Sequence, residues 1–405
     1  MLDIYKYKSV TNSGRVVEGE YSGRTENDIV KIIRKKNQIP IKIEKIENKS
    51  RLKEFFNIFN YKIKFKDLSV FCKQLHTMLY AGMPLKNSLE VLLRQTKNKR
   101  LSLIVEAIVI QIQKGISLSS AMQNYEVVFT PLLINMVKVG EITGNLDEVL
   151  DKMAKHFENE YKINQKIRNT LIYPIILGII STIVVILILV FIMPSFINMF
   201  HDFNARLPLP TKLLLLLSKA IIKYNFLILI LILLFFLCFK KIYHVKFIKE
   251  KCDELKFKLP IIKTIVVELF VMRFTRVLSL LLSSGLPIVT SLDVSADTTN
   301  NKFVETKIKH LTKGVKKGSK LAALWDDMQF LPPMVVSMIA IGEESGALDK
   351  MLLKISDFYE EEFNSHIEKL ISIFEPAMII IMSLIVGSII FAIMLPMFEM
   401  MELLV

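Results

Sequence analysis

Residues 140–147, with the sequence GEITGNLD, recur in altered form as residues 342–349, with the sequence GEESGALD. The same offset relates Pro174 to Pro376, and it drifts by a single residue between Gly82 and Gly285. An offset of about 202 residues far exceeds the roughly 20–50 residues of a solenoid repeat. The chain therefore contains a duplicated domain, and the duplication restricts its topology.

Each copy runs into a long segment without charged residues. No charged side chain lies between Arg168 and Asp202, or between Glu375 and Glu399. The second segment has about 23 residues, and as a helix it covers roughly 34 Å, enough for the roughly 30 Å hydrocarbon core of a bilayer. A shorter apolar run reaches the necessary length if the lysines at its start extend to the interface. The sequence thus predicts three transmembrane helices, at residues 171–193, 213–239 and 373–398.

Lysine and arginine are distributed unevenly around these segments, and they favour the cytoplasmic side. The flanks before the first span and after the second are rich in lysine, whereas the tail after the third has none. We expect a cytoplasmic N-terminus, an external connector at 194–212, a basic cytoplasmic connector at 240–267 and an external tail at 399–405. The unrepeated middle span reverses the chain once more, so both copies face the cytoplasm as parallel repeats.

Helix signals before the first and third spans predict two helical domains. Apolar residues at helical spacing, interrupted by glycine, proline and capping residues, indicate about six helices in each of residues 67–170 and 268–372. Asp67 and Ser117 are predicted N-caps, and Thr130 begins the fifth helix. Residues 1–47 have the pattern of a small β-β-α-β module, and a basic linker, 48–66, follows. The predicted fold class is a mainly α integral membrane protein with two homologous cytoplasmic six-helix bundles.

The repeated segment supplies the candidate site residues. Its first glycine permits close helix approach or an unusual backbone angle, and its second is expected to break the chain between the fifth and sixth helices. Its aspartate falls in the first turn of the sixth helix, where the helix dipole favours an acid. The set is Gly140, Glu141, Gly144, Leu146 and Asp147 in the first copy, and Gly342, Glu343, Gly346, Leu348 and Asp349 in the second.

The repeated glutamates occupy an unfavourable place. Glu141 and Glu343 fall at the end of the fifth helix, where the dipole disfavours an acid, so each is expected to have a partner. Three interpretations stay open: a structural cap or intramolecular ion pair, a contact with another protein, and a metal ligand. The first copy has Ile142 where the second has Glu344, which argues against a two-acid metal site in the first copy.

Glu375 precedes Pro376 at the start of the third predicted span, where the first copy has Tyr173. Neighbouring groups allow proline inside a membrane helix. The carboxylate lies near the inner boundary, so it either reaches water or forms a polar contact with another membrane helix. Such a helix would be the first span of the same chain or the helix of a substrate.

Motifs for catalysis and cofactor binding are absent from the sequence. There is no GxxxxGK[ST], HExxH or GxSxG motif, and the six histidines lack metal-ligand spacing. We therefore predict no enzyme activity, no cofactor and no metal site. The three cysteines fit small apolar fillers better than disulfides. The net charge of +14 gathers mainly beside the predicted spans, where anionic lipid attracts it, and no nucleic-acid motif accompanies it.

Several ordered segments carry a resemblance to a known family. They are QL…ML.AGMPL at 74–85, GE..GNL at 140–146, LIYP at 171–174, PSF at 194–196 and LPLPT at 207–211, followed by RF…SGLP at 273–287, GE.SG.L at 342–348 and EP…G…PMF at 375–398. With these segments the chain resembles the type II secretion F-domain family, the inner-membrane platform proteins of type IV pilus and type II secretion machines. The resemblance extends over roughly residues 1–400.

This resemblance implies a scaffold in the cytoplasmic membrane that couples a hexameric assembly ATPase to the extraction and insertion of pilin or pseudopilin subunits. It also implies contacts with other inner-membrane components of the machine and with lipid, and a homo-oligomer, most simply a dimer. It implies no direct contact with nucleic acid. A DNA-uptake pseudopilus platform and a membrane transporter are the alternatives; almost no charged residues are available in three spans to line a transport path.

Overall fold

A computed structural model describes residues 3–11, 16–23, 38–45, 63–194, 208–224, 260–299, 301–326 and 330–403, with single positions elsewhere. It divides into two units, residues 1–63 and 64–405. In the first unit, strands β1 (Asp3–Thr11), β2 (Val16–Gly23) and β3 (Gln38–Lys45) form an antiparallel sheet in the order β2-β1-β3. Pro40 lies on the edge strand β3, where a missing N–H is tolerated. The helix expected between β2 and β3 lies mostly outside the described residues, as does the linker at 48–62.

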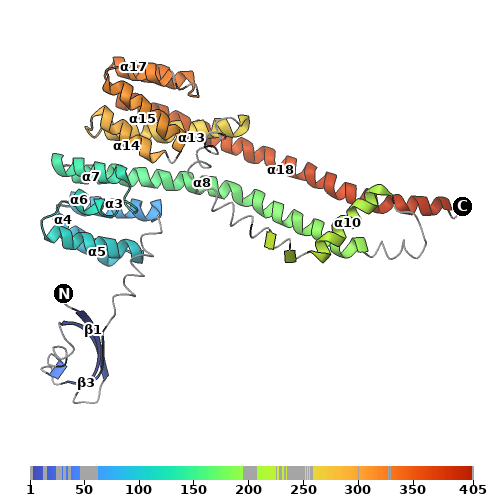
Figure 1. Cartoon of the computed structure of the whole chain (residues 1–405). Helices are drawn as coiled ribbons and strands as arrows, with labels where there is room; N and C mark the ends of the chain where they lie inside the picture. The colour runs from blue at the N-terminus through green and yellow to red at the C-terminus, as the bar shows by residue number, and fades with distance from the viewer. Residues whose placement is uncertain are drawn as a thin grey trace. The chain divides into compact units, whose positions relative to one another are not determined.

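The second unit begins with the helices of the first repeat (Figure 1). The cap predicted at Ser117 is confirmed, and so is the helix start predicted at Thr130, whose hydroxyl also accepts a hydrogen bond from a backbone N–H group. The N-cap predicted at Asp67 is wrong, because Phe65 stacks on Phe157 and the helix extends back to it. The helices are α3 (Phe65–Tyr80), α4 (Leu85–Gln95), α5 (Lys99–Gln113), α6 (Leu118–Gln123), α7 (Pro131–Thr143) and α8 (Leu146–Leu187).

The second repeat follows the same order of helices. Its core is built around Trp325, which is 1% exposed and packs against Phe274 with ring centroids 5.3 Å apart. Ile163 of α8 belongs to this same core, so the two repeats share packed apolar surface. The helices are α13 (Pro260–Leu282), α14 (Ile288–Thr298), α15 (Lys302–Lys316), α16 (Leu321–Asp326), α17 (Pro333–Glu344) and α18 (Leu348–Leu403).

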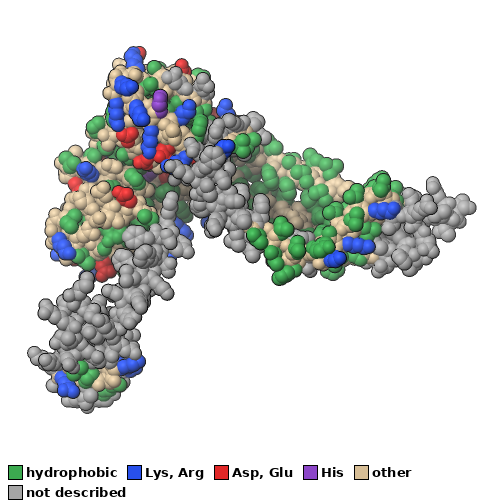
Figure 2. Space-filling view, viewed as in Figure 1, with side chains coloured by type: hydrophobic (Ala, Val, Ile, Leu, Met, Phe, Trp, Pro, Cys, Tyr) green, Lys and Arg blue, Asp and Glu red, His purple; other side chains and the backbone are tan. Residues whose placement is uncertain are grey.

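The last helix of each repeat continues without a break into the apolar segment. Pro174 lies inside α8 and Pro376 inside α18. Residues 146–192 and 348–395 are long and apolar enough to cross a membrane. Figure 2 shows hydrophobic side chains gathered over this part of the molecule, where Ile179 and Leu384 are more than half exposed. A bilayer would cover such a surface, which water would not favour.

A further helix, α10 (Leu209–Lys223), packs against the far ends of both long helices. The Ser218 hydroxyl donates a hydrogen bond to the Leu189 carbonyl at 2.6 Å, and Leu189 belongs to the short π-helix η1 (Ile188–Ile192). A π-turn changes the usual backbone pairing, so a side chain that takes up a freed carbonyl is favoured in an apolar region. The rest of the predicted second span, up to residue 239, lies mostly outside the described residues.

Candidate functional site: the repeated motif and the seam between the repeats

Each of the two repeated glutamates contacts the start of a neighbouring short helix in its own repeat. The Glu141 carboxylate accepts hydrogen bonds from the backbone N–H groups of Leu118 and Ser119, at the start of α6. Glu343 accepts from Leu321 at 2.9 Å and from Ala322 at 3.2 Å, at the start of α16. A carboxylate there satisfies free N–H donors and faces the positive end of the helix dipole. The geometry is that of a structural cap supplied by the end of α7 or α17.

The first glycine of the motif lies where two helices touch. A Cβ atom on Gly140 would come within 2.9 Å of the Cα atom of Leu146, and one on Gly342 within 3.1 Å of the Cα atom of Leu348. The second glycine, at 144 and 346, has a φ of 76° and 67°, the left-handed region that glycine adopts without strain. The motif therefore folds α7 back onto the start of α8, and α17 onto the start of α18.

The aspartates of the motif are held through their backbone. In the first repeat the Nδ1–H group of His76 donates to the carbonyl of Asp147 at 2.8 Å. In the second repeat the Ser279 hydroxyl donates to the carbonyl of Asp349 at 2.7 Å. Different side chains thus make the same contact in both copies and tie the start of each long helix to the first helix of its repeat.

The surface where α8 meets α13 and α18, which we call the seam, carries a charged pair. Arg273 of α13 lies 2.9 Å from Glu160 and donates a hydrogen bond to the side chain of Asn164 at 3.1 Å, both on α8. The side chain of Glu160 is only 12% exposed. Burial raises the pKa of its carboxyl above the usual range, and the Arg273 guanidinium opposes this shift. Glu160 therefore depends on the arginine of the other repeat for its charge.

A pocket of about 260 Å³ lies beside this pair on the seam. His156 lines it together with Arg276, which pairs with Asp357 and Glu360 on α18. Burial lowers the pKa of His156 to about 4, and the two arginines of α13 add to this effect. His156 is consequently neutral near pH 7, so the positive charge around the pocket comes from Arg276, Lys152 and Lys155, which also line it.

Two contacts along the seam join equivalent positions of the two repeats. Lys166 lies 2.9 Å from Glu368, and the Tyr173 hydroxyl donates to Glu375 at 3.3 Å; each pair is separated by 202 residues. Two helices can touch at equivalent positions only if they run parallel and in register. The seam therefore relates α8 and α18 by an approximate two-fold axis along their length, and Glu375 contacts the first apolar helix of its own chain.

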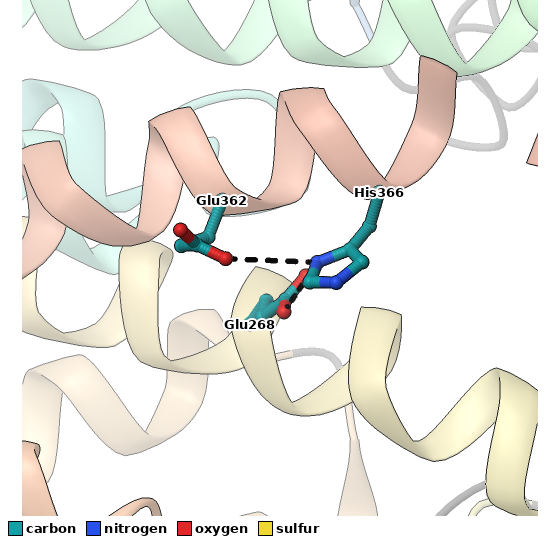
Figure 3. A group of neighbouring side chains, drawn as sticks. All are labelled: Glu268, Glu362 and His366. Carbon is teal, nitrogen blue, oxygen red and sulfur yellow. Dashed lines mark ion pairs between the residues drawn. The ribbon is translucent and has the colours of Figure 1, made fainter. Parts of the chain in front are cut away.

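A three-residue cluster lies between α13 and α18, in the second repeat (Figure 3). The Glu268 carboxylate lies 2.8 Å from Nδ1 of His366, and the Glu362 carboxylate lies 4.0 Å from the same nitrogen. Burial raises the pKa of Glu268; His366 opposes the shift, and the neighbouring Glu362 adds to it. Sequence reasoning missed this cluster because Glu268 lies on another helix. The signal available in the sequence was the spacing of Glu362 and His366, one helical turn apart.

Comparison with known proteins agrees with this duplicated architecture. The family model "Type II secretion system (T2SS), protein F" matches the chain twice, at residues 71–194 and 274–396. This chain belongs to that family.

The names of its relatives refer to type IV pilus assembly and to the type II secretion system. A Type IV pilus assembly protein PilC from Thermus thermophilus is 32% identical over 98% of this chain and 98% of that protein. A protein of the same name from Myxococcus xanthus is 30% identical over 98% of this chain and 94% of its own length. A Type II secretion system protein F from Vibrio cholerae is 29% identical over 98% of each chain.

Proposed function

We propose that this protein is the inner-membrane platform of a type IV pilus or type II secretion machine. The observation that carries the proposal is the pair of family repeats, each continuing as one helix into a membrane-length apolar segment. Such a helix links a domain in water rigidly to a segment in the bilayer. The role is that of a scaffold, in which movement of a repeat is passed to its membrane helix and no bond is made or broken.

The proposal includes specific partners. Two similar repeats on one side of the membrane offer two similar surfaces to a hexameric assembly ATPase, and the exposed apolar faces of α8 and α18 are available to pilin or pseudopilin helices and to lipid. A dimer of the platform would double these surfaces. The contact between Tyr173 and Glu375 holds the two membrane helices together where they enter the bilayer. We assign Glu141 and Glu343 to the stability of the fold, because each capping carboxylate is already engaged.

A cysteine-labelling experiment tests the orientation of the chain. Single cysteines at Asn204 and after Glu402 should react with an impermeant reagent in intact cells, because the lysine-poor segments face outside. Cysteines at Lys114 and Lys317, in equivalent turns of the two repeats, should react only after the cells are opened. The two cytoplasmic positions control for one another. Labelling of Lys317 in intact cells would overturn the parallel arrangement.

A deletion strain tests the function. Without this chain, the pilin-like subunits of the source organism should remain in the membrane and form no extracellular fibre, while the ATPase keeps its cellular level. The full chain should restore fibres. The variant Glu141→Gln, which keeps its size but loses its charge, should restore fibres in proportion to the amount of folded protein. Normal fibres in the deletion strain would refute the function, and stable Glu141→Gln protein without fibres would assign this residue to a partner.

A further inference from the structure

We infer that Glu268, Glu362 and His366 form a binding site for a divalent transition metal of the zinc class, which fastens α13 to α18 in the second repeat. The three ligand atoms, one from each side chain, lie within 4.8 Å of one another. Figure 3 shows the two side chains of α18 and the one side chain of α13 converging on the same space.

The spacing of the three groups suits a small tetrahedral ion. Zinc bonds of about 2.0–2.2 Å to nitrogen and oxygen place neighbouring ligand atoms roughly 3.3 Å apart. In the cluster the distances from Nδ1 of His366 are 2.8 Å to Glu268 and 4.0 Å to Glu362, one shorter and one longer than this value. Small side-chain rotations bring all three into place. A fourth position is left for water, because Glu362 and His366 are 44% and 33% exposed.

Unused polar atoms provide independent support for the site. The side chain of Glu268 is only 7% exposed, and its Oε2 atom has no hydrogen-bond partner among the described residues. Nδ1 of His366 also lacks a partner with hydrogen-bonding geometry, although Glu268 is close to it. A buried carboxylate oxygen without a partner costs free energy, and a cation removes that cost. The ring nitrogen and the two carboxylates lie close enough for one cation to bind all three.

The equivalent residues of the first repeat bind a cation that the second repeat supplies. Glu160 and Asn164 of α8 correspond to Glu362 and His366 of α18 at the repeat offset, and the guanidinium of Arg273 binds both. In the second repeat a histidine replaces the amide, and a second acid, Glu268, faces the pair in place of an arginine. The second cluster therefore also requires a positive charge, but its imidazole and two carboxylates are groups that bind a metal ion. One nitrogen and two carboxylates favour Zn²⁺ over Mg²⁺ and Ca²⁺, which prefer six or more oxygen ligands.

Metal binding to the purified full-length chain in detergent tests the inference. With Zn²⁺ alone as the probe, we expect one Zn²⁺ ion to bind tightly to each chain. The unfolding temperature, monitored by the fluorescence of Trp325, should rise when Zn²⁺ is added and stay unchanged with Mg²⁺. His366→Gln and Glu362→Gln should each weaken Zn²⁺ binding by at least about tenfold, because loss of even a group that only orients a metal ligand costs about that much. The matched controls His310→Gln and Glu361→Gln, at exposed positions, should bind as the wild type does.

Cobalt separates this site from the cysteines of the chain. Co²⁺ bound by one imidazole and two carboxylates should give the visible absorption of a four-coordinate ion without the intense near-ultraviolet band of a thiolate ligand. These wild-type measurements remain decisive if a variant fails to fold. Either of two results would overturn the inference: no Zn²⁺-dependent rise in the unfolding temperature of the wild type, or unchanged Zn²⁺ binding in folded His366→Gln.

Discussion

Replacing Arg273 by methionine should lower the free energy of unfolding by about 3 kcal/mol, the lower end of the cost of breaking a buried ion pair. The variant keeps an unbranched apolar stem but leaves Glu160 on α8 with little solvent and without its ion-pair partner. The pKa of Glu160, already raised by burial, should rise further. Chemical denaturation followed by Trp325 fluorescence measures the loss directly, because this is the only tryptophan of the chain and lies in the adjoining core.

Two further variants distinguish the loss of the ion pair on the seam from a general effect of removing a charge. Lys155→Met breaks a pair with Asp151 in which the lysine is 69% exposed, and such screened surface pairs contribute little to stability. The double change Arg273→Met with Glu160→Met replaces both charges by apolar groups and should recover most of the loss. Arg273→Met protein with wild-type stability would show that the pair does not hold the repeats together.

Replacing Gly342 by alanine should lower stability by about 1–3 kcal/mol, the usual cost of forcing an extra carbon into a packed site. The new Cβ would lie 3.1 Å from the Cα atom of Leu348 and 3.0 Å from the Cβ atom of Met351. One of these contacts is with backbone, so rotation of a side chain cannot relieve it, and α17 must move away from α18. The same movement would pull the Glu343 carboxylate from the start of α16. Trp325 fluorescence again reports the unfolding of this repeat.

Gly387→Ala is the matched control for the glycine prediction. Gly387 lies in the same helix, α18, and a Cβ atom there would meet nothing within 4 Å. Alanine favours a helix over glycine by about 1 kcal/mol, so this change should leave stability unaltered or raise it slightly. Equal destabilisation by Gly342→Ala and Gly387→Ala would contradict the close approach of α17 and α18.

Local patterns in the sequence predicted much of the helical architecture. The repeated GE..G.LD segment revealed the duplication, and Ser117 and Thr130 marked helix starts, because a capping side chain bonds to N–H groups two or three residues ahead. The length of each uncharged segment predicted the membrane helices at 171–193 and 373–398, since length and hydropathy alone decide whether a helix fits a bilayer. The wrong N-cap at Asp67 shows the limit of such patterns: the helix begins two residues earlier, at Phe65, which stacks on Phe157 of a distant segment.

The sequence by itself determined that this protein is a duplicated, helical membrane protein of the secretion F family, because those properties depend on composition, period and local motifs. Only the tertiary structure decided what the charged side chains contact. The sequence left Glu141 with three interpretations, and its actual neighbours are backbone N–H groups of another helix. Glu268 meets His366, and Arg273 meets Glu160, through the rotation and crossing of packed helices. That geometry is set by how side chains of distant segments fill the space between helices, which no periodicity in the chain records.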